Sequence, residues 1–424
     1  MNEKLALLGG SKTVTIQLEE KWEPPYGKIK EMIGKQIERG AFSGDWEETY
    51  FKFEKEFKDY IGSKYCTALG SGTLSLWAAY YGIGIKPGDE VIVPSYTWIS
   101  TISPAIYMGA KPVLCDIEEG KLTADLKDIR KRITSKTKAI ALVHIYGNVC
   151  NMDGIIDIAR EYGLYVIEDC SHCHGAEWNG KKAGTIGHVG CFSMQGDFYR
   201  GKPVAAGEGG VVITDNADIF GRILMYTHLN RPQNPEDMVS EEYMKFKPAN
   251  LGGKFRAHPF ALSIARVSLE SLDYRNELKS RYRQKLFDAF EEIPGIFPIK
   301  SYISAKTAGY YGGMHMLYDE NFFEGLPRDK FIDALKAEGV VMKHRDYQPM
   351  HLSRLFHEGY DIYGTNTGGM AGDYKGYEKG DFPVTESTYA KLMGMPVLTI
   401  EPDGYSTQII EAFRKVASNY KQLL

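Results

Sequence analysis

Seven short apolar runs, separated by stretches with helical spacing, constrain the fold of this chain more than any other feature. Runs of this kind favour strands that are buried on both faces, and their alternation with helical stretches favours a mainly parallel sheet covered by helices. From about residue 260 to 290 the pattern becomes helical, which predicts a long connecting helix. The apolar runs fall near residues 65–69, 90–94, 111–116, 138–145, 164–169, 189–193 and 210–214.

The length of 424 residues exceeds one typical domain, so we expect two. We place an N-terminal arm at 1–20, a large domain at 21–265, and the connecting helix with a small C-terminal α/β domain at 266–424. The glycine-rich segment Thr365–Gly380 predicts a surface loop that could act as a lid over a site.

Composition and charge exclude several classes of protein. The formal net charge of −4 gives no electrostatic footprint for nucleic acid, and no run of 18 apolar residues predicts a membrane span. The segment 1–12 has no apolar core of a signal peptide, and six scattered cysteines are typical of reduced, buried thiols, so we expect a cytoplasmic protein. Cys170 and Cys173 form a C-x-x-C pair, but no second pair has ligand spacing, so we predict no metal.

One lysine, Lys202, stands in the glycine-rich stretch between two of the apolar runs, 190–194 and 210–214. A lysine held where its charge is disfavoured can be neutral near pH 7 and can form a Schiff base with an aldehyde such as pyridoxal 5′-phosphate (PLP). Most lysines beside glycines are solvated loop charges, so the interpretation depends on finding the other parts of a PLP site.

Residues suited to those parts follow the predicted strands. Asp169 ends a buried run, where a carboxylate could hold the ring nitrogen of PLP protonated, although a helix N-cap is its ordinary role. His172 could reach the 3-oxygen of the ring, and Trp98 could stack on the ring, but each is more often structural. Gly72 and Thr73 open a helical stretch whose N-terminus could bind a phosphate.

Six segments of the sequence together match the motifs of a known protein family. They are SGTLSL (71–76), GDEVIVPSYTWIST (88–101), KTKAIALVHIYGN (136–148), VIEDCSHCHGA (166–176), CFSMQ (191–195) and GEGGVVITD (207–215). In this order the chain resembles the DegT/DnrJ/EryC1/StrS family of PLP-dependent sugar and cyclitol aminotransferases. The resemblance implies PLP-dependent transferase fold type I, aspartate aminotransferase-like, with a mainly parallel seven-stranded sheet. It also implies a homodimer with shared active sites.

The resemblance assigns roles to individual residues. It implies that Lys202 binds the cofactor aldehyde and that Asp169 pairs with the ring nitrogen, as the two catalytic residues. It places His172 on the 3-oxygen and Trp98 on the ring face. The phosphate positions fall on Gly72, Thr73 and Ser193.

Two departures from the family pattern fall near the site. Ser193 and Lys202 are nine positions apart, as though Asp197–Arg200 were inserted, so the loop between them must bulge. Lys254 stands where members commonly have an Asn that reaches the phosphate of the neighbouring subunit. Lysine is itself a competent phosphate ligand, so the resemblance makes Lys254 a cofactor-binding residue supplied across the dimer.

The activity that the resemblance implies is transfer of an amino group from glutamine or glutamate to a keto-cyclitol of inosose type or a keto-sugar, in biosynthesis of an amino sugar or aminocyclitol, including antibiotics. An aminotransferase or dehydratase acting on a nucleotide-linked 4-keto-6-deoxy sugar is the alternative, although related dehydratases replace the lysine by histidine. A nucleotide-binding oxidoreductase is disfavoured because Ser75 breaks the glycine fingerprint. A non-catalytic PLP-binding regulator is disfavoured because the lysine is present.

Candidate substrate contacts are Gln195, Tyr310, Tyr311, His344 and Arg345.

Overall fold

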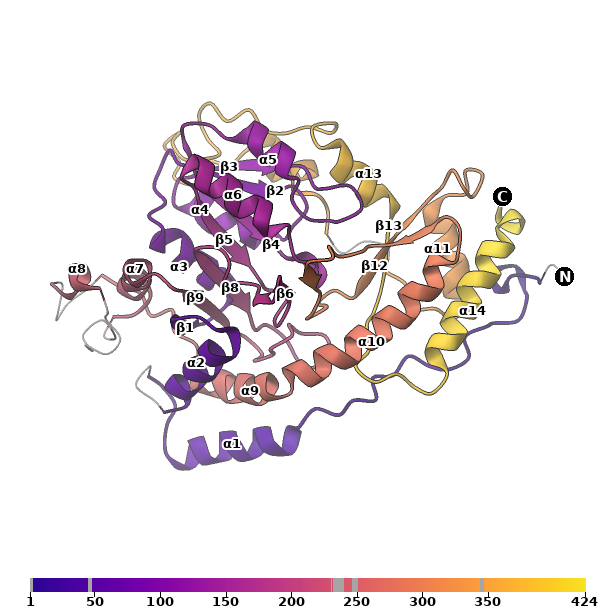
Figure 1. The fold of residues 1–424 in the computed structure, drawn as a ribbon, viewed down its shortest axis with the longest axis horizontal. Coiled ribbons are helices and arrows are strands. Elements are labelled where there is room, and N and C mark those ends of the chain that lie inside the picture. Colours follow the sequence, from indigo (N-terminus) through magenta and orange to yellow (C-terminus); the bar gives the residue numbers. More distant parts are fainter. Residues whose placement is uncertain (1–2, 45–47, 230, 232–239, 246–250, 344–346) are drawn as a thin grey trace.

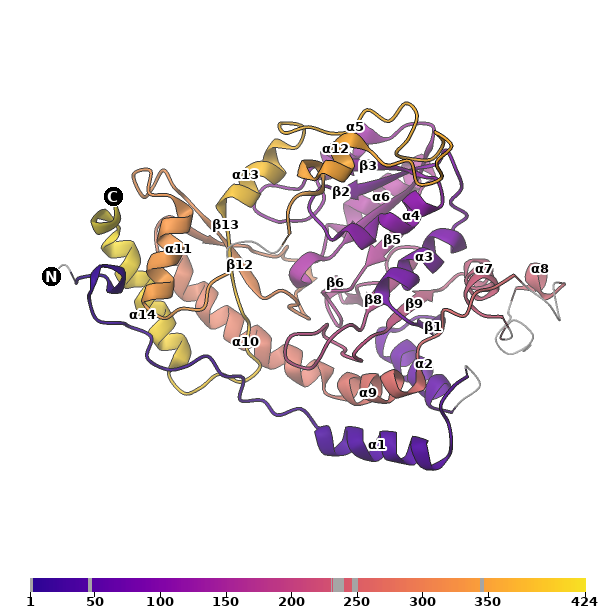
Figure 2. The same ribbon diagram turned by 180° about the vertical axis from the view of Figure 1, so that it is seen from behind.

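The computed structural model describes residues 3–44, 48–229, 231, 240–245, 251–343 and 347–424. Figures 1 and 2 show a large lobe built around a twisted sheet and a smaller lobe that contains both ends of the chain, joined by a long helix. Among the described residues no helix combines the length and the apolar character needed to cross a membrane.

The central sheet has seven strands in the order β1-β9-β8-β5-β4-β2-β3. Four neighbouring pairs are parallel, whereas β9 runs antiparallel to both β1 and β8. The prediction of a mainly parallel seven-stranded sheet is therefore confirmed. The strands are β1 (Tyr65–Leu69), β2 (Glu90–Pro94), β3 (Lys111–Cys115), β4 (Thr137–Val143), β5 (Tyr165–Asp169), β8 (Val189–Ser193) and β9 (Gly210–Thr214).

Helices cover both faces of this sheet, which explains why its strands are continuous apolar runs. One face packs against α2 (Glu48–Ile61), α5 (Leu126–Arg132), α6 (Met152–Tyr162) and α9 (Pro259–Glu270). The other face packs against α3 (Gly72–Gly82), α4 (Ser103–Tyr107) and α7 (Ala217–Thr227). The short helix α8 (Glu241–Met244) contacts α7, and α1 (Tyr26–Glu38) packs on α9.

The smaller lobe follows α10 (Leu272–Glu291), the long helix that the sequence predicts between the lobes. Its antiparallel sheet contains β10 (Ile296–Pro298), β12 (Met314–Tyr318) and β13 (Leu392–Met395). The helices α11 (Arg328–Ala337) and α14 (Tyr405–Ser418) cover that sheet and form a second core with it. A third small sheet joins β6 (Glu177–Trp178), β7 (Lys181–Lys182) and β11 (Ala305–Lys306).

The chain returns to the large lobe between residues 350 and 382, where α12 (Arg354–Glu358) lies before α13 (Pro383–Lys391). Phe356 and Phe382 join the core on the α3 face of the central sheet. The Tyr377 hydroxyl accepts from the Leu114 N–H at 3.0 Å, so this segment covers the edge strand β3. No residue of the Thr365–Gly380 segment lines the pocket described below, so the expectation that it forms a lid stays a prediction.

Candidate functional site

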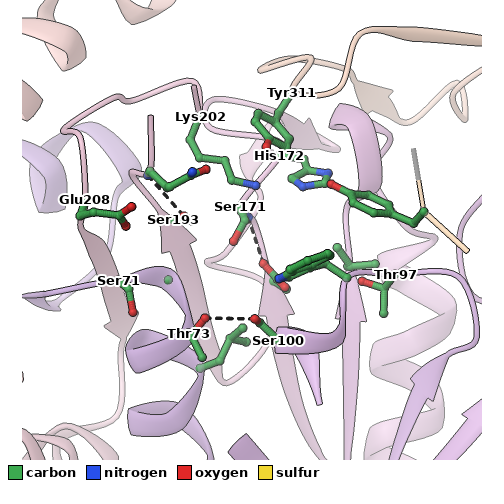
Figure 3. A pocket seen from close by; sticks show the side chains of 17 residues that line it. Ser71, Thr73, Thr97, Ser100, Ser171, His172, Ser193, Lys202, Glu208 and Tyr311 are labelled. Carbon is green, nitrogen blue, oxygen red and sulfur yellow. Dashed lines mark hydrogen bonds between the residues drawn. The ribbon is translucent and has the colours of Figure 1, made fainter. Parts of the chain in front are cut away.

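A cavity of about 350 Å³ opens at the carboxyl ends of β5 and β8, beside the N-terminus of α3 (Figure 3). In mainly parallel sheets this is the edge where ligands bind, because loops and helix N-termini converge there. The lining residues are Ser71, Gly72, Thr73, Leu76, Thr97, Trp98, Ser100, Val143, Asp169, Ser171, His172, Ser193, Gln195, Lys202, Glu208, Tyr311 and Tyr347.

Lys202 reaches into this cavity from the loop that joins β8 to β9 (Figure 3). Its backbone N–H donates to the Gln195 carbonyl at 2.8 Å, which fixes the point where the side chain starts. Burial lowers the pKa of the Lys202 ammonium to about 8, although the charge of Asp169 acts in the opposite direction. A substantial fraction of this lysine is therefore a neutral amine slightly above neutral pH.

The extra residues between Ser193 and Lys202 form the expected bulge. Gly196 and Gly207 pair at its base, and the Asp197 carboxylate accepts from the N–H groups of Tyr199 and Arg200, each at 2.7 Å. Phe198 is 7% exposed and packs beside Trp22, so the bulge is anchored to the segment that precedes α1. The insertion is a folded turn that leaves the lysine in the cavity.

Asp169 is the last residue of β5, and its side chain is buried. One carboxylate oxygen accepts from the Thr101 hydroxyl at 2.8 Å, and the other accepts from the Ser171 N–H at 3.1 Å. These donors orient the carboxylate. Asp169 thus places a carboxylate of fixed orientation in the lining of the cavity.

His172 lies beside Lys202 and Tyr311 at the cavity wall (Figure 3). Its Nδ1 accepts from the Tyr146 N–H at 3.2 Å, which leaves Nε2 to carry the proton of the neutral ring. Burial and the charge of Lys202 hold the pKa of His172 well below its usual range. Tyr146 reaches this position with a left-handed backbone (φ 55°), an uncommon conformation for a residue other than glycine.

The N-terminus of α3 forms one corner of the cavity. Ser71 caps the helix by accepting from the Leu74 N–H at 3.1 Å, and Gly72 begins it. A Cβ on Gly72 would lie 2.5 Å from the Ser193 Cβ, so only glycine lets the helix start so close to β8. The Thr73 hydroxyl donates to the Ser100 hydroxyl at 3.1 Å. Hydroxyl-bearing residues and the start of a helix therefore line the same part of the cavity, an arrangement typical of anion sites.

The predicted ring-stacking residue Trp98 lines the cavity and is 56% exposed. Its ring lies 5.8 Å from that of Tyr347. Such exposure is unusual for a large aromatic side chain that follows a buried strand, and it leaves a ring face open to a ligand.

The predicted substrate contacts divide into three groups. Gln195 and Tyr311 line the cavity. Tyr310 does not line it, because it is buried and its hydroxyl donates to the Thr307 carbonyl at 2.9 Å. His344 and Arg345 lie outside the described residues. Lys254 is exposed and does not line the cavity of its own chain, so its assignment to the cofactor of a neighbouring subunit stays a prediction.

Sequence reasoning missed several lining residues, among them Glu208 and Tyr347. Glu208 is part of the GEGG word that follows Lys202, which could have signalled its place. Tyr347 follows α11 in the sequence, in a stretch that contains no recognisable motif.

Within the described part of the chain, His144, Glu168 and Cys170 form the one group spaced closely enough to hold a metal ion. Glu168 pairs with His144 at 3.0 Å and also accepts from the N–H groups of Gly184 and Ile186. This carboxylate therefore has structural partners already, and the prediction of no metal stays a prediction.

Comparison with known proteins identifies the family. A model of the DegT/DnrJ/EryC1/StrS aminotransferase family matches residues 28–414. The chain belongs to this family. It is therefore an aminotransferase, as the resemblance in the sequence predicts.

The relatives and structural neighbours agree. An L-glutamine:scyllo-inosose aminotransferase from Streptomyces griseus is 32% identical over 367 residues, which cover 84% of each chain. A GDP-perosamine synthase from Vibrio cholerae is 41% identical over 169 residues, 40% of this chain and 45% of that one. An aminotransferase from Psychrobacter cryohalolentis has a TM-score of 0.80 at 24% identity, covering 95% of this chain and 98% of that one. The fold type I prediction is confirmed.

Proposed function

We propose that this aminotransferase depends on PLP and moves an amino group from glutamine or glutamate to a keto-cyclitol of inosose type or a keto-sugar. The observation that carries the proposal is the partly buried Lys202 amine in a cavity whose lining also includes the oriented carboxylate of Asp169 and a helix N-terminus suited to an anion. An amine, a carboxylate and a phosphate-binding corner in one cavity match the aldehyde, the ring nitrogen and the phosphate of PLP.

The residues of the cavity fit PLP part by part. The corner formed by Gly72, Thr73 and Ser193 would hold the phosphate, because glycine at position 72 lets the start of α3 lie directly against Ser193. Trp98 would cover a ring face, and the Nε2–H of His172 would donate to the 3-oxygen. When bound, PLP would serve as the electron sink that stabilises negative charge at the carbon that loses its proton.

The chain's own side chains would supply the proton transfer. Lys202 Nζ is the base and acid, because a pKa of about 8 lets it accept and return a proton near neutral pH. The Asp169 carboxylate would pair with the ring nitrogen and would favour the protonated ring. The partly enclosed cavity strengthens both electrostatic effects by excluding water.

The relatives support the substrate class. One of them acts, by its name, with glutamine on scyllo-inosose, and another is named as a synthase of GDP-linked perosamine. The match to the inosose enzyme covers most of this chain, whereas the match to the perosamine enzyme covers less than half. We therefore place the cyclitol first and keep a nucleotide-linked 4-keto-6-deoxy sugar as the second acceptor. Lys202 disfavours dehydration at this site.

An acceptor screen with ¹⁵N-labelled donors tests this proposal. The purified protein is supplied with PLP, with glutamine labelled at the α-amino or at the amide nitrogen, and with scyllo-inosose or a nucleotide-linked 4-keto-6-deoxy sugar. We expect the α-amino label, and not the amide label, to appear in the amino derivative of the cyclitol. Labelling of the nucleotide sugar alone would establish the second acceptor, and labelling of neither would contradict the proposed substrate class.

We further propose a cytoplasmic homodimer with shared sites. The helix α3 is apolar on every side, and its outer residues Trp77 and Tyr81 remain half-buried, stacked on Tyr107 and Tyr226. A helix without a polar face is normally buried completely, which supports a second copy of the chain over this surface. All six cysteines are unpaired and buried, in keeping with a reducing compartment.

The shared site leads to a prediction about Lys254, which we propose to contact the cofactor phosphate of the neighbouring subunit. Lys254→Ala should weaken PLP retention, measured by equilibrium dialysis. A mixed dimer of Lys254→Ala and Lys202→Ala subunits should keep one intact site, because one site retains both lysines. A mixed dimer with both sites inactive would contradict the exchange, and so would a fully active monomer in sedimentation.

A further inference from the structure

The face of the Tyr311 ring covers the end of the Lys202 side chain. The distance between Lys202 Nζ and the ring centroid is 3.5 Å, well inside the range of a cation–π interaction. Figure 3 shows the two side chains meeting at the top of the cavity, with His172 beside them. The centroids of the Tyr311 and His172 rings are 4.6 Å apart. The ammonium group therefore rests on an aromatic surface inside a partly enclosed site.

The backbone around Tyr311 is built to hold the ring in this place. Gly309, Tyr310, Gly312 and Gly313 all have positive φ, between 53° and 100°. Positive φ is costly for a residue with a side chain, whereas glycine adopts it freely. Most of these positions are glycines, so the turn forms with little strain.

Three other parts of the fold clamp this turn. A Cβ on Gly309 would lie 2.5 Å from the His172 carbonyl oxygen, and one on Gly313 would lie 2.2 Å from the Met395 carbonyl oxygen. The Gly309 N–H donates to the Asn276 side chain on α10 at 3.1 Å. The backbone turn that carries Tyr311 is thus packed against the loop that follows β5, against the end of β13 and against α10.

The charges around Lys202 do not by themselves explain where its ammonium group rests. Asp169 on β5 attracts it, whereas a proton on His172 or His174 would repel it, and both histidines are held neutral by burial. No salt bridge or hydrogen bond of Lys202 Nζ is found among the described residues, whereas its contact with the face of the Tyr311 ring is.

We propose that Tyr311 is a positioning residue for Lys202, whose ring face holds the ammonium group at the cavity wall whenever the lysine is not bonded to a ligand. This inference deepens the proposed function, on which its role in catalysis rests. Transamination releases the lysine in each half-reaction, and a released flexible side chain must stay within reach of the reacting carbon. The lysine can leave the ring face without breaking a hydrogen bond.

The first test measures the pKa of Lys202 in the full-length protein freed of cofactor. Competitive labelling with trace acetic anhydride across pH, read by mass spectrometry of the Lys202 peptide, gives this value for one lysine. Removing the ring in Tyr311→Leu should lower the pKa by roughly 0.5 to 1.5. Tyr311→Phe is the matched control, since it keeps the ring face and should leave the pKa unchanged. Equal pKa values in all three proteins would overturn the proposal.

The second test needs no substitution at Tyr311 and decides the matter if Tyr311→Leu fails to fold. Reductive methylation with ¹³C-formaldehyde labels the free lysines, and the Lys202 methyl signals are assigned by their loss in Lys202→Arg. If the amine rests on the ring face, these signals are shifted upfield by the ring current. Unshifted signals would overturn the proposal. Both tests use ligand-free protein, so failure of the proposed transamination would not alter their results.

Discussion

Two opposed effects set the charge of Lys202 in this site. Burial lowers its pKa to about 8, and the negative charge of Asp169 limits that fall. Because only the neutral amine attacks an aldehyde, capture of the cofactor should quicken as the pH rises through about 8 and level off above it. Asp169 therefore acts on the lysine as well as on the proposed ring nitrogen.

The residue most open to a test at this scale is Asp169. In Asp169→Asn the amide oxygen can still accept from the Ser171 N–H, so the variant should fold and retain some PLP. Loss of the charge should reduce transamination by roughly 10³-fold, the size of loss seen when a central electrostatic group is removed. The measurement is kcat/KM with glutamine as donor.

Thr101→Val serves as the control, because it removes one hydrogen bond to the Asp169 carboxylate and keeps the charge. It should cost far less activity than Asp169→Asn. If Asp169→Asn transaminated at a rate near that of the unaltered protein, the proposed role of its charge would be wrong.

Among the elements, the bulge at 196–201 lies in the loop that carries Lys202. Phe198 ties the bulge to Trp22, and the guanidinium of Arg275 lies 5.9 Å from the centre of the Phe198 ring. Arg275 in turn donates to the carbonyl of Pro203, next to Lys202, at 2.8 Å. The start of α10 and the segment before α1 thus hold the lysine loop from both sides.

Truncation of that anchor gives a prediction. Phe198→Ala should lower the free energy of unfolding by about 2–3 kcal/mol, because it removes a buried ring and leaves a cavity. Arg200→Ala is the matched control in the same turn, since its side chain is exposed. Urea unfolding of the two variants checks this. Equal stability would show that Phe198 does not anchor the bulge.

The strands could be predicted from sequence because each is a short apolar run that both faces of the sheet bury. The residues at their ends, such as Asp169 and Ser193, follow from that placement. The choice between Tyr310 and Tyr311 could not be predicted, since it depends on the left-handed backbone at Tyr310. Tyr347 was missed because it is brought to the cavity by tertiary packing alone.

The sequence also could not predict that residues 350–382 return to the large lobe. Residues 350–382 look like a loop because they are rich in glycine and polar side chains. Their role follows from a property of the whole sheet, namely that β3 is an edge strand whose backbone groups need partners. Tyr377 supplies one of these partners. The division at residue 265 stays a prediction.

For the molecule as a whole, a buried histidine links stability to pH. His174 packs against Phe57 and Phe192, and neither of its ring nitrogens has a hydrogen-bond partner among the described residues. Burial, with the nearby charges of Lys202 and Arg275, lowers its pKa from 6.5 to about 3. As the pH falls, the unfolded chain therefore protonates this histidine before the folded chain does. The contribution of the neutral His174 to stability is complete above pH 6.5 and is lost as the pH drops toward 3.

His174→Leu isolates this effect, because leucine fills the site and takes up no proton. Between pH 7 and pH 5 the free energy of unfolding should fall by about 2 kcal/mol more in the unaltered protein than in the variant. Urea titrations at the two pH values measure the difference. An identical fall in both proteins would contradict a neutral, buried His174.

The central claim is that Lys202 is the lysine that binds the cofactor, and one measurement tests it directly. The purified protein is saturated with PLP, reduced with borohydride to fix any Schiff base, and digested for peptide mass spectrometry. The account predicts one phosphopyridoxyl group per chain, on the peptide that contains Lys202, and none in Lys202→Ala. A label on Lys254 or on any other lysine, or no label at all, would contradict it.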